Sequence, residues 1–206
     1  MTHTPTFGVP EPWLVPVTLE NAHVRLEPLT TAHAAELCEA AGDVSTFDYF
    51  SVIPTTWDEA GFVRYTEYLH GPAKTIPFCV VDLASGKRVG MTSYLAIMPT
   101  NRSAEIGWTW ISPAFRGTVV NPSMKRLLLS HAFDTMGAIR MQLRTDERNK
   151  HSQAAISKLG AKLEGTHRQD KLMHDGFRRS SVFYSILEDE WPAVRDGLDA
   201  RIAAYG

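Results

Sequence analysis

Residues 116–121, RGTVVN, have the composition of a loop that holds an anion at the start of a helix. Asn121 is a favoured N-cap residue, and Pro122 suits the first helical position, where its missing N–H costs nothing. Unpaired backbone N–H groups and the helix dipole attract phosphate at such a position. Lys125 and Arg126 add positive charge to the first turn. The sequence therefore predicts a phosphate-binding loop, with a plain capped loop as the alternative.

Val119 stands where phosphate-binding loops most often have glycine. If this position needs a positive φ, a β-branched residue costs about 1–2 kcal/mol. If φ is negative, the backbone N–H still faces the anion and only crowding remains. A loss of about 1.4 kcal/mol would weaken binding tenfold. Val119 therefore leaves two alternatives, a weakened anion site and an unchanged one.

Glu105 lies in SAEIGWTWI, residues 103–111, whose composition predicts a strand. In a regular strand Glu105, Gly107, Thr109 and Ile111 share one face, and Ile106, Trp108 and Trp110 share the other. A carboxylate that faces a binding slot can act as a general base. The alternative is that Glu105 is salt-bridged or faces solvent. Because no His, Cys or carboxylate set has metal-ligand spacing, we expect no metal.

The order of the predicted elements indicates an α+β fold with a mixed sheet covered by helices. Residues 1–20 are rich in proline and predict an extended arm, and residues 21–206 predict one domain. The predicted strands are 23–29, 77–83, 88–97, 103–112, 139–146, 161–169 and 178–187. The predicted helices are 30–43, 55–71 with a capping box of Thr56 and Glu59, 122–136, 151–160 and 188–205, the C-terminal helix.

The composition narrows the class of protein. The 206 residues carry a net charge of −2 without long basic blocks, so nucleic acid is not an expected partner. No apolar run approaches the roughly 20 residues that span a bilayer, and the N-terminus lacks the zones of a signal peptide. Cys38 and Cys79 are far apart and predict reduced thiols. We therefore expect a cytoplasmic protein without membrane partners, and the sequence allows a homodimer.

Two longer stretches resemble one known family. EIGWTWISPAFRG, residues 105–117, and NKHSQAAISKLGAKLEG, residues 149–165, are similar to the GCN5-related N-acetyltransferases, especially the branch with ribosomal-protein alanine N-acetyltransferases. The resemblance spans residues 23–187 and implies a mostly antiparallel, twisted sheet. It also implies a V-shaped splay between two central parallel strands, with helices on both faces.

The resemblance implies an enzyme that transfers the acetyl group of acetyl-CoA directly to a primary amine, without a metal. A protein N-terminus is the acceptor that this branch suggests. A small amine, such as an antibiotic, a polyamine or an amino-acid derivative, is the alternative acceptor. A coenzyme A-binding module without turnover is the alternative to an enzyme.

The resemblance also assigns roles to individual residues. The pyrophosphate of acetyl-CoA would be held by Arg116, Gly117, Thr118, Val119, Val120 and Asn121. The pantetheine arm would pair with Trp110, Ile111 and Ser112, and the thioester end would lie near Asn149 and Ser152.

For catalysis, Glu105 is the expected base and the Ile111 N–H the expected donor to the oxyanion. Many members of the family use a tyrosine as the acid at the position of Ile156. Ser152 is the nearest replacement by spacing, and a helix-capping role is its alternative. The aromatic side chains of Phe47, Tyr49, Phe50, Trp108 and Trp110 could line an acceptor pocket or belong to the core.

Overall fold

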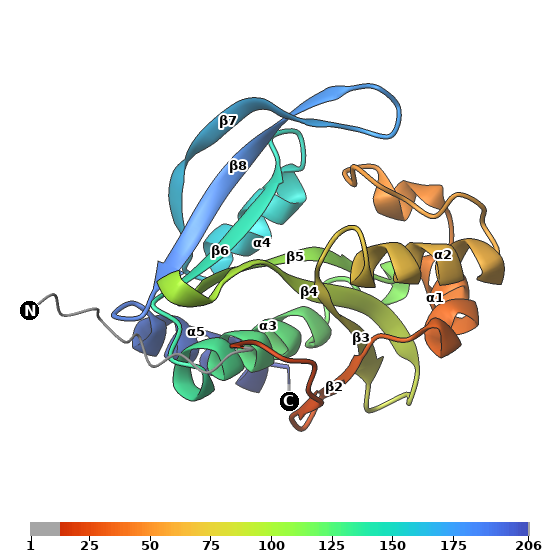
Figure 1. Cartoon of the computed structure of the whole chain (residues 1–206). Coiled ribbons are helices and arrows are strands. Elements are labelled where there is room, and N and C mark those ends of the chain that lie inside the picture. The colour runs from red at the N-terminus through yellow and green to blue at the C-terminus, as the bar shows by residue number, and fades with distance from the viewer. Residues whose placement is uncertain (1–12, 206) are drawn as a thin grey trace, which may run out of the picture.

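The computed structural model describes residues 13–205 and has one mixed sheet with the strand order β1-β2-β3-β4-β5-β6-β8-β7 (Figure 1). The strands are β1 Leu19–Glu20, β2 Val24–Pro28, β3 Ile76–Asp82, β4 Arg88–Met98, β5 Ser103–Ile111, β6 Arg140–Asp146, β7 Lys162–Leu172 and β8 Arg178–Leu187. All neighbouring strands are antiparallel except β5 and β6. The predicted mixed, mostly antiparallel sheet is confirmed.

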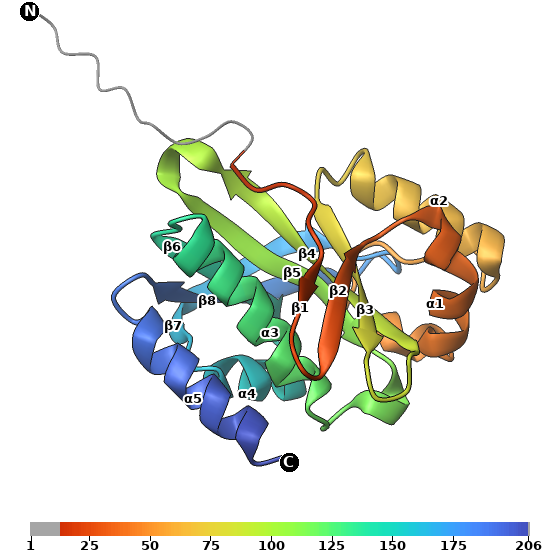
Figure 2. The same cartoon turned by 90° about the horizontal axis from the view of Figure 1, so that it is seen from below.

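Helices cover both faces of this sheet, as predicted (Figures 1 and 2). They are α1 Ala34–Ala41, α2 Glu59–His70, α3 Val120–Ser130, α4 Lys150–Lys158 and α5 Trp191–Ala203. One hydrophobic cluster packs α1 and α2 against one face, and a larger cluster packs α3, α4 and α5 against the other. The two clusters place a different set of side chains behind each face of β5.

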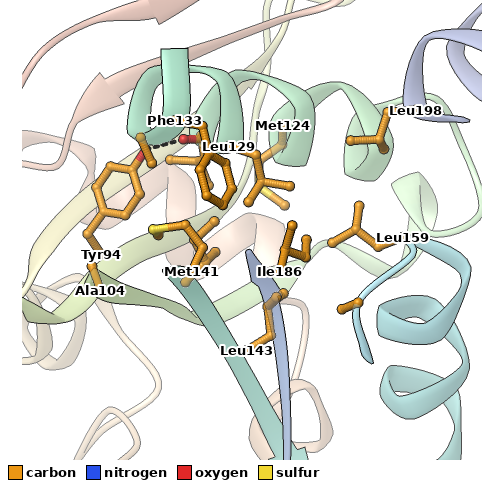
Figure 3. Close-up of a cluster of buried hydrophobic side chains, with 14 of the residues drawn as sticks. Tyr94, Ala104, Met124, Leu129, Phe133, Met141, Leu143, Leu159, Ile186 and Leu198 are labelled. Carbon is orange, nitrogen blue, oxygen red and sulfur yellow. Dashed lines mark hydrogen bonds between the residues drawn. The ribbon is translucent and has the colours of Figure 1, made fainter. Parts of the chain in front are cut away.

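The larger cluster holds α3 firmly against the sheet (Figure 3). Met124 and Leu129 of α3 pack with Met141 of β6 and Ile186 of β8. The hydroxyl of Tyr94 on β4 donates a hydrogen bond to the carbonyl oxygen of Leu128. A buried hydroxyl needs such a partner, so this bond fixes the position of α3 as well as filling the core. The start of α3 is thereby fixed relative to the end of β5.

The parallel strands β5 and β6 separate soon after they begin. They pair only through Ser103, Ala104 and Glu105, which face Arg140, Met141 and Gln142. Beyond Glu105 the two strands run on to Ile111 and Asp146 without further pairing. The predicted V-shaped splay between two central parallel strands is therefore confirmed.

A β-bulge in β5 corrects the predicted alternation of its side chains. Met91 and Ser93 of β4 face Trp110 and Gly107, so Trp108 and Thr109 together oppose a single residue of β4. Trp108 has a φ of 50°, an uncommon and strained value for a bulky residue.

After the bulge the two faces of the strand exchange. Trp108 and Trp110 pack with the cluster of α1 and α2, whereas Ile106 and Ile111 pack with the cluster of α3. The prediction that Glu105, Thr109 and Ile111 share a face is wrong, because the extra residue shifts the alternation by one position.

Two predicted helix starts are also corrected. The side chain of Asp58, not that of Thr56, caps α2 and accepts a hydrogen bond from the Gly61 N–H at 2.7 Å. Helix α3 begins at Val120 with Val119 as its N-cap, so Asn121 and Pro122 lie within its first turn.

The described part of the predicted N-terminal arm packs closely on the fold. Trp13 is 1% exposed and donates a hydrogen bond from its indole Nε1 to the carbonyl oxygen of Met136 at 2.8 Å. Leu19 and Glu20 form the short edge strand β1, which the sequence did not predict. The rest of the predicted arm, residues 1–12, lies outside the described residues.

Candidate active site

A cavity of about 720 Å³ opens where β5 and β6 diverge, a size typical of small-molecule sites. Its walls include the predicted site residues Glu105, Trp110, Ile111, Arg116, Gly117, Asn121, Asn149 and Ser152. Ser112, Thr118, Val119 and Val120 belong to the same loop and helix start but do not line the cavity wall. One continuous space therefore joins the predicted anion loop, the strand with Glu105 and the start of α4.

The loop before α3 places its left-handed residue at Gly117 and not at Val119. Gly117 has a φ of 78°, whereas Val119 has helical angles, with φ −63° and ψ −16°. A valine adopts these angles without strain. Of the two alternatives for Val119, the one with negative φ is therefore realised.

Several backbone N–H groups at this loop have no acceptor within the described part of the chain. They belong to Gly117, Thr118, Val119 and Asn121. The Val120 N–H has only a long bond, 3.4 Å, to the hydroxyl oxygen of Thr118. Free N–H groups at a helix start are the donors that a phosphate requires. The loop thus fits the pyrophosphate of coenzyme A.

Arg116 is held by the protein. Its Nε donates to the carbonyl oxygen of Ile111 at 3.1 Å, and its Nη2 approaches the hydroxyl oxygen of Thr46 at 3.4 Å. The N–H of Ser112 donates to the carbonyl oxygen of Val89 at 2.7 Å. Alternate residues of a strand point their N–H groups to opposite sides, so the Ile111 N–H faces away from β4, toward the splay.

Glu105 is 2% exposed, and both of its carboxylate oxygens accept hydrogen bonds. Arg144 Nε donates to Oε1 at 2.9 Å, and Gln142 Nε2 donates to Oε2 at 2.7 Å. Burial raises the pKa of Glu105 above its usual value, although the charge of Arg144 acts in the opposite direction. Glu105 is therefore a salt-bridged carboxylate that lines the cavity, and its raised pKa suits proton transfer near neutral pH.

At the opposite wall, Asn149 is the N-cap of α4. Its side-chain oxygen accepts a hydrogen bond from the Ser152 N–H at 2.9 Å, which leaves the Asn149 amide nitrogen free of described partners. Ser152 contributes its backbone to this cap and lines the cavity. Ile156 lines the cavity as well, so an apolar side chain occupies the position where many relatives have a tyrosine.

Most of the predicted aromatic residues lie at the cavity. Tyr49, Phe50, Trp108 and Trp110 line it, whereas Phe47 is fully buried within the aromatic cluster of α1 and α2. Phe47 is thus an ordinary core residue. The others form an aromatic wall on the side of the sheet away from α3.

Sequence reasoning assigned no role inside the cavity to Lys125, Lys171 or Arg179, and all three line it. Lys125 of α3 is 8% exposed, and its Nζ donates to the Thr109 hydroxyl at 3.1 Å. Burial lowers the pKa of Lys125 to about 7. Lys125 looked like a surface charge of a first turn, and only its four-residue spacing from the core residues Leu128 and Leu129 gave a weak hint of burial.

Residues 23–162 match the family described as "Acetyltransferase (GNAT) domain". A protein of Bacillus subtilis named "Putative ribosomal N-acetyltransferase YdaF" is 33% identical over 109 residues, which cover 53% of this chain and 58% of that protein. The chain thus spans little more than half the length of this relative.

Solved structures agree over nearly the whole chain. An acetyltransferase of T. thermophilus has a TM-score of 0.85 and 35% identity, covering 92% of this chain and 98% of that one. A GCN5-related N-acetyltransferase from Brucella melitensis has a TM-score of 0.86 and 28% identity, covering 93% and 87%.

None of the helices in residues 13–205 combines the length and apolarity needed to cross a membrane. The family match covers more than half of the chain, and the solved structures share its splayed sheet. The chain therefore belongs to the GCN5-related N-acetyltransferase (GNAT) family and is an N-acetyltransferase.

Proposed function

We propose that this protein transfers the acetyl group of acetyl-CoA directly to a primary amine. The single observation that carries the proposal is the continuous cavity that runs from the free N–H groups of the Gly117 loop, along β5, to Glu105. Phosphate donors at one end and a buried carboxylate at the other are what a thioester donor and an amine acceptor need. The GNAT family uses acetyl-CoA, which this arrangement accommodates.

The two faces of β5 divide the substrates between them. The N-terminus of α3 lies on the face of Ile106 and Ile111, so coenzyme A would enter from that face. The aromatic wall with Trp108 lies on the other face, together with Glu105, and would receive the acceptor amine. The splay connects the two faces, so the amine would meet the thioester between the strands.

Each chemical step has a candidate group in this chain. Glu105 would take a proton from the acceptor amine, directly or through a water molecule. The Ile111 N–H would stabilise the oxyanion that forms when the amine attacks the thioester carbonyl. Ser152 would lie near the departing thiolate, and with Ile156 in place of a tyrosine the thiolate would leave with little help from an acid.

For the acceptor, we propose a protein N-terminus, in line with the ribosomal N-acetyltransferase that the name of YdaF describes. A small amine is the second candidate. The enclosed part of the cavity beside Tyr49 and Phe50 favours an acceptor whose reacting end is narrow. Both acceptors present such an end.

The test measures free thiol released from acetyl-CoA in the presence of peptides with free N-termini and of small amines. We expect release that depends on the acceptor, together with an acceptor that gains one acetyl group by mass spectrometry. The same peptides with blocked N-termini are the control. Tight coenzyme A binding without acceptor-dependent release from any amine would contradict the proposal.

A further inference from the structure

Two basic residues face each other across the hairpin of β7 and β8. Lys171 and Arg179 are directly paired in the register of these antiparallel strands, and both side chains line the cavity. Like charges that lie directly opposite each other destabilise a strand pair. The hairpin therefore carries a local cost at a position that opens into the active site.

Nearby carboxylates do not neutralise this pair. Within the described chain, neither Lys171 nor Arg179 forms a salt bridge. Glu105 is bound by Arg144 at 2.9 Å, and Asp146 is bound by Arg148 at 2.7 Å.

The third nearby cation adds to the imbalance. The charge of Arg144 acts on both residues of the pair, and it lowers the pKa of each together with burial, which is the larger cause. Asp170 precedes Lys171 on β7 but is exposed to solvent and does not line the cavity. The wall beside Glu105 is thus more positive than its own carboxylates can balance.

The guanidinium of Arg179 is buried with one edge unused. The residue is 9% exposed, and its Nη1 donates to the carbonyl oxygen of Tyr49 at 2.9 Å. Its Nε is buried without any hydrogen-bond partner among the described residues. Burying a charged donor without an acceptor is costly, and the edge formed by Nε and Nη2 matches a carboxylate in a bidentate pair.

We propose that the pair formed by Lys171 and Arg179 binds a carboxylate of the acceptor, so that the preferred acceptor is a primary amine that also carries a carboxylate. This inference rests on the proposed function of the cavity and narrows its substrate class. The carboxylate can be the α-carboxylate of an amino acid or the side chain of an acidic residue near a peptide N-terminus. The amine end would lie toward Glu105, which also lines the cavity.

The experiment compares acceptors that differ only in this group. Alanine and alaninamide test the α-carboxylate, and Ala-Asp-amide and Ala-Asn-amide test the acidic side chain. We expect at least one carboxylate member to have kcat/KM about tenfold or more above its neutral partner, the change that one charge-assisted hydrogen bond supports. The preference should lie in KM, with kcat nearly equal.

Lys171→Met and Arg179→Met should each reduce this ratio to about one. Arg178→Met is the matched control, because Arg178 lies next to Arg179 on β8 but is exposed and does not line the cavity. Thermal unfolding of each variant checks the fold. If Arg179→Met fails to fold, Lys171→Met alone carries the test, since Lys171 is only half-buried.

A binding measurement separates this inference from the proposed function. Calorimetry with coenzyme A present compares N-acetylalanine with N-acetylalaninamide, and the acetylated Ala-Asp-amide with its Ala-Asn partner, none of which requires turnover. Tighter binding of a carboxylate member, lost in Lys171→Met, supports the inference even if acetyl transfer fails. Equal binding within both pairs, or a preference that Lys171→Met leaves unchanged, overturns it.

Discussion

The Nζ of Lys125 lies 3.1 Å from the hydroxyl oxygen of Thr109, which in turn lies 2.7 Å from the hydroxyl oxygen of Thr92. This chain of polar groups crosses from α3 to β5 and β4, below the start of the helix. Lys125 forms no salt bridge within residues 13–205, so its amine is stabilised by hydroxyl groups alone. Such an environment disfavours the charged form.

Lys125 should make the stability of the protein depend on pH. Burial lowers its folded pKa to about 7, whereas the unfolded value is about 10.4. Between these values the unfolded state binds more protons, so the free energy of unfolding rises with pH, by up to about 1.4 kcal/mol per pH unit. Below about pH 7 both states are protonated and this contribution to the slope disappears.

Lys125→Met should remove this slope, as measured by urea unfolding at several pH values between 7 and 10 with tryptophan fluorescence. Lys150→Met is the control, because Lys150 is exposed at the start of α4 and should leave the slope in place. Parallel curves for the wild type and Lys125→Met would show that Lys125 stays charged when folded.

The loop before α3 should respond to substitutions at Gly117 and Val119 in opposite ways. A Cβ added at Gly117 meets nothing within 4 Å, but its φ of 78° makes Gly117→Ala cost about 1–2 kcal/mol of strain. Val119 already has a φ of −63°, so Val119→Gly relieves no strain.

Calorimetric titration with coenzyme A checks this expectation. Val119→Gly should change the dissociation constant by no more than about threefold, whereas Gly117→Ala should weaken binding by up to about tenfold if the strain is relieved by moving the loop. Coenzyme A binding that tightens tenfold in Val119→Gly would mean that the bound loop needs a positive φ at that position.

The sheet could be predicted from the sequence because its strands have the composition and turn signals of a packed, mostly antiparallel structure. The segments 77–83, 88–97 and 139–146 became β3, β4 and β6 with ends shifted by a residue or two. The start of α3 was misplaced because the Thr118 hydroxyl approaches the Val120 N–H, an interaction that a search for the best N-cap residue does not favour.

The site could be predicted only in part, because much of it depends on register. The bulge at Trp108 exchanges the faces of β5, yet nothing in a tryptophan signals a left-handed conformation. Lys171 and Arg179 are paired across a hairpin whose register shifts between His167 and Lys171. Such irregularities are set by packing across the sheet, and they decide which charges enter the cavity.

Asn149 should have two separable roles. Its side-chain oxygen caps α4, so Asn149→Ala should lower the free energy of unfolding by about 1 kcal/mol. Asn149→Asp keeps the acceptor oxygen and should keep the stability, but it replaces the free amide with a negative charge. We therefore expect weaker acetyl-CoA binding in Asn149→Asp.

Urea unfolding and calorimetric titration with acetyl-CoA measure the two roles of Asn149 separately. Ser152→Ala is the control for the cap, because Ser152 takes part in it through its backbone N–H and should leave stability unchanged. Full affinity in Asn149→Asp would restrict Asn149 to its role as a helix cap.

Glu105 should set the acidic limb of the pH profile of kcat/KM. A base works only when it is deprotonated, and burial raises the pKa of Glu105 above the ordinary value for a glutamate. Activity should therefore fall as the pH drops toward that raised value. Glu105→Gln should lower kcat/KM by roughly 10²–10⁴ at neutral pH and abolish the limb, while coenzyme A binding stays unchanged.

Arg144→Met separates a catalytic Glu105 from a structural one. The charge of Arg144 holds the pKa of Glu105 down against burial, so its removal should raise that pKa further and move the acidic limb to higher pH. At a pH well above the limb the variant should then recover most of its activity, which a broken site would not do. A limb that stays in place in Arg144→Met, together with equal losses of activity in Arg144→Met and Glu105→Gln at every pH, would assign the two residues to a salt bridge that only holds β5 and β6 together.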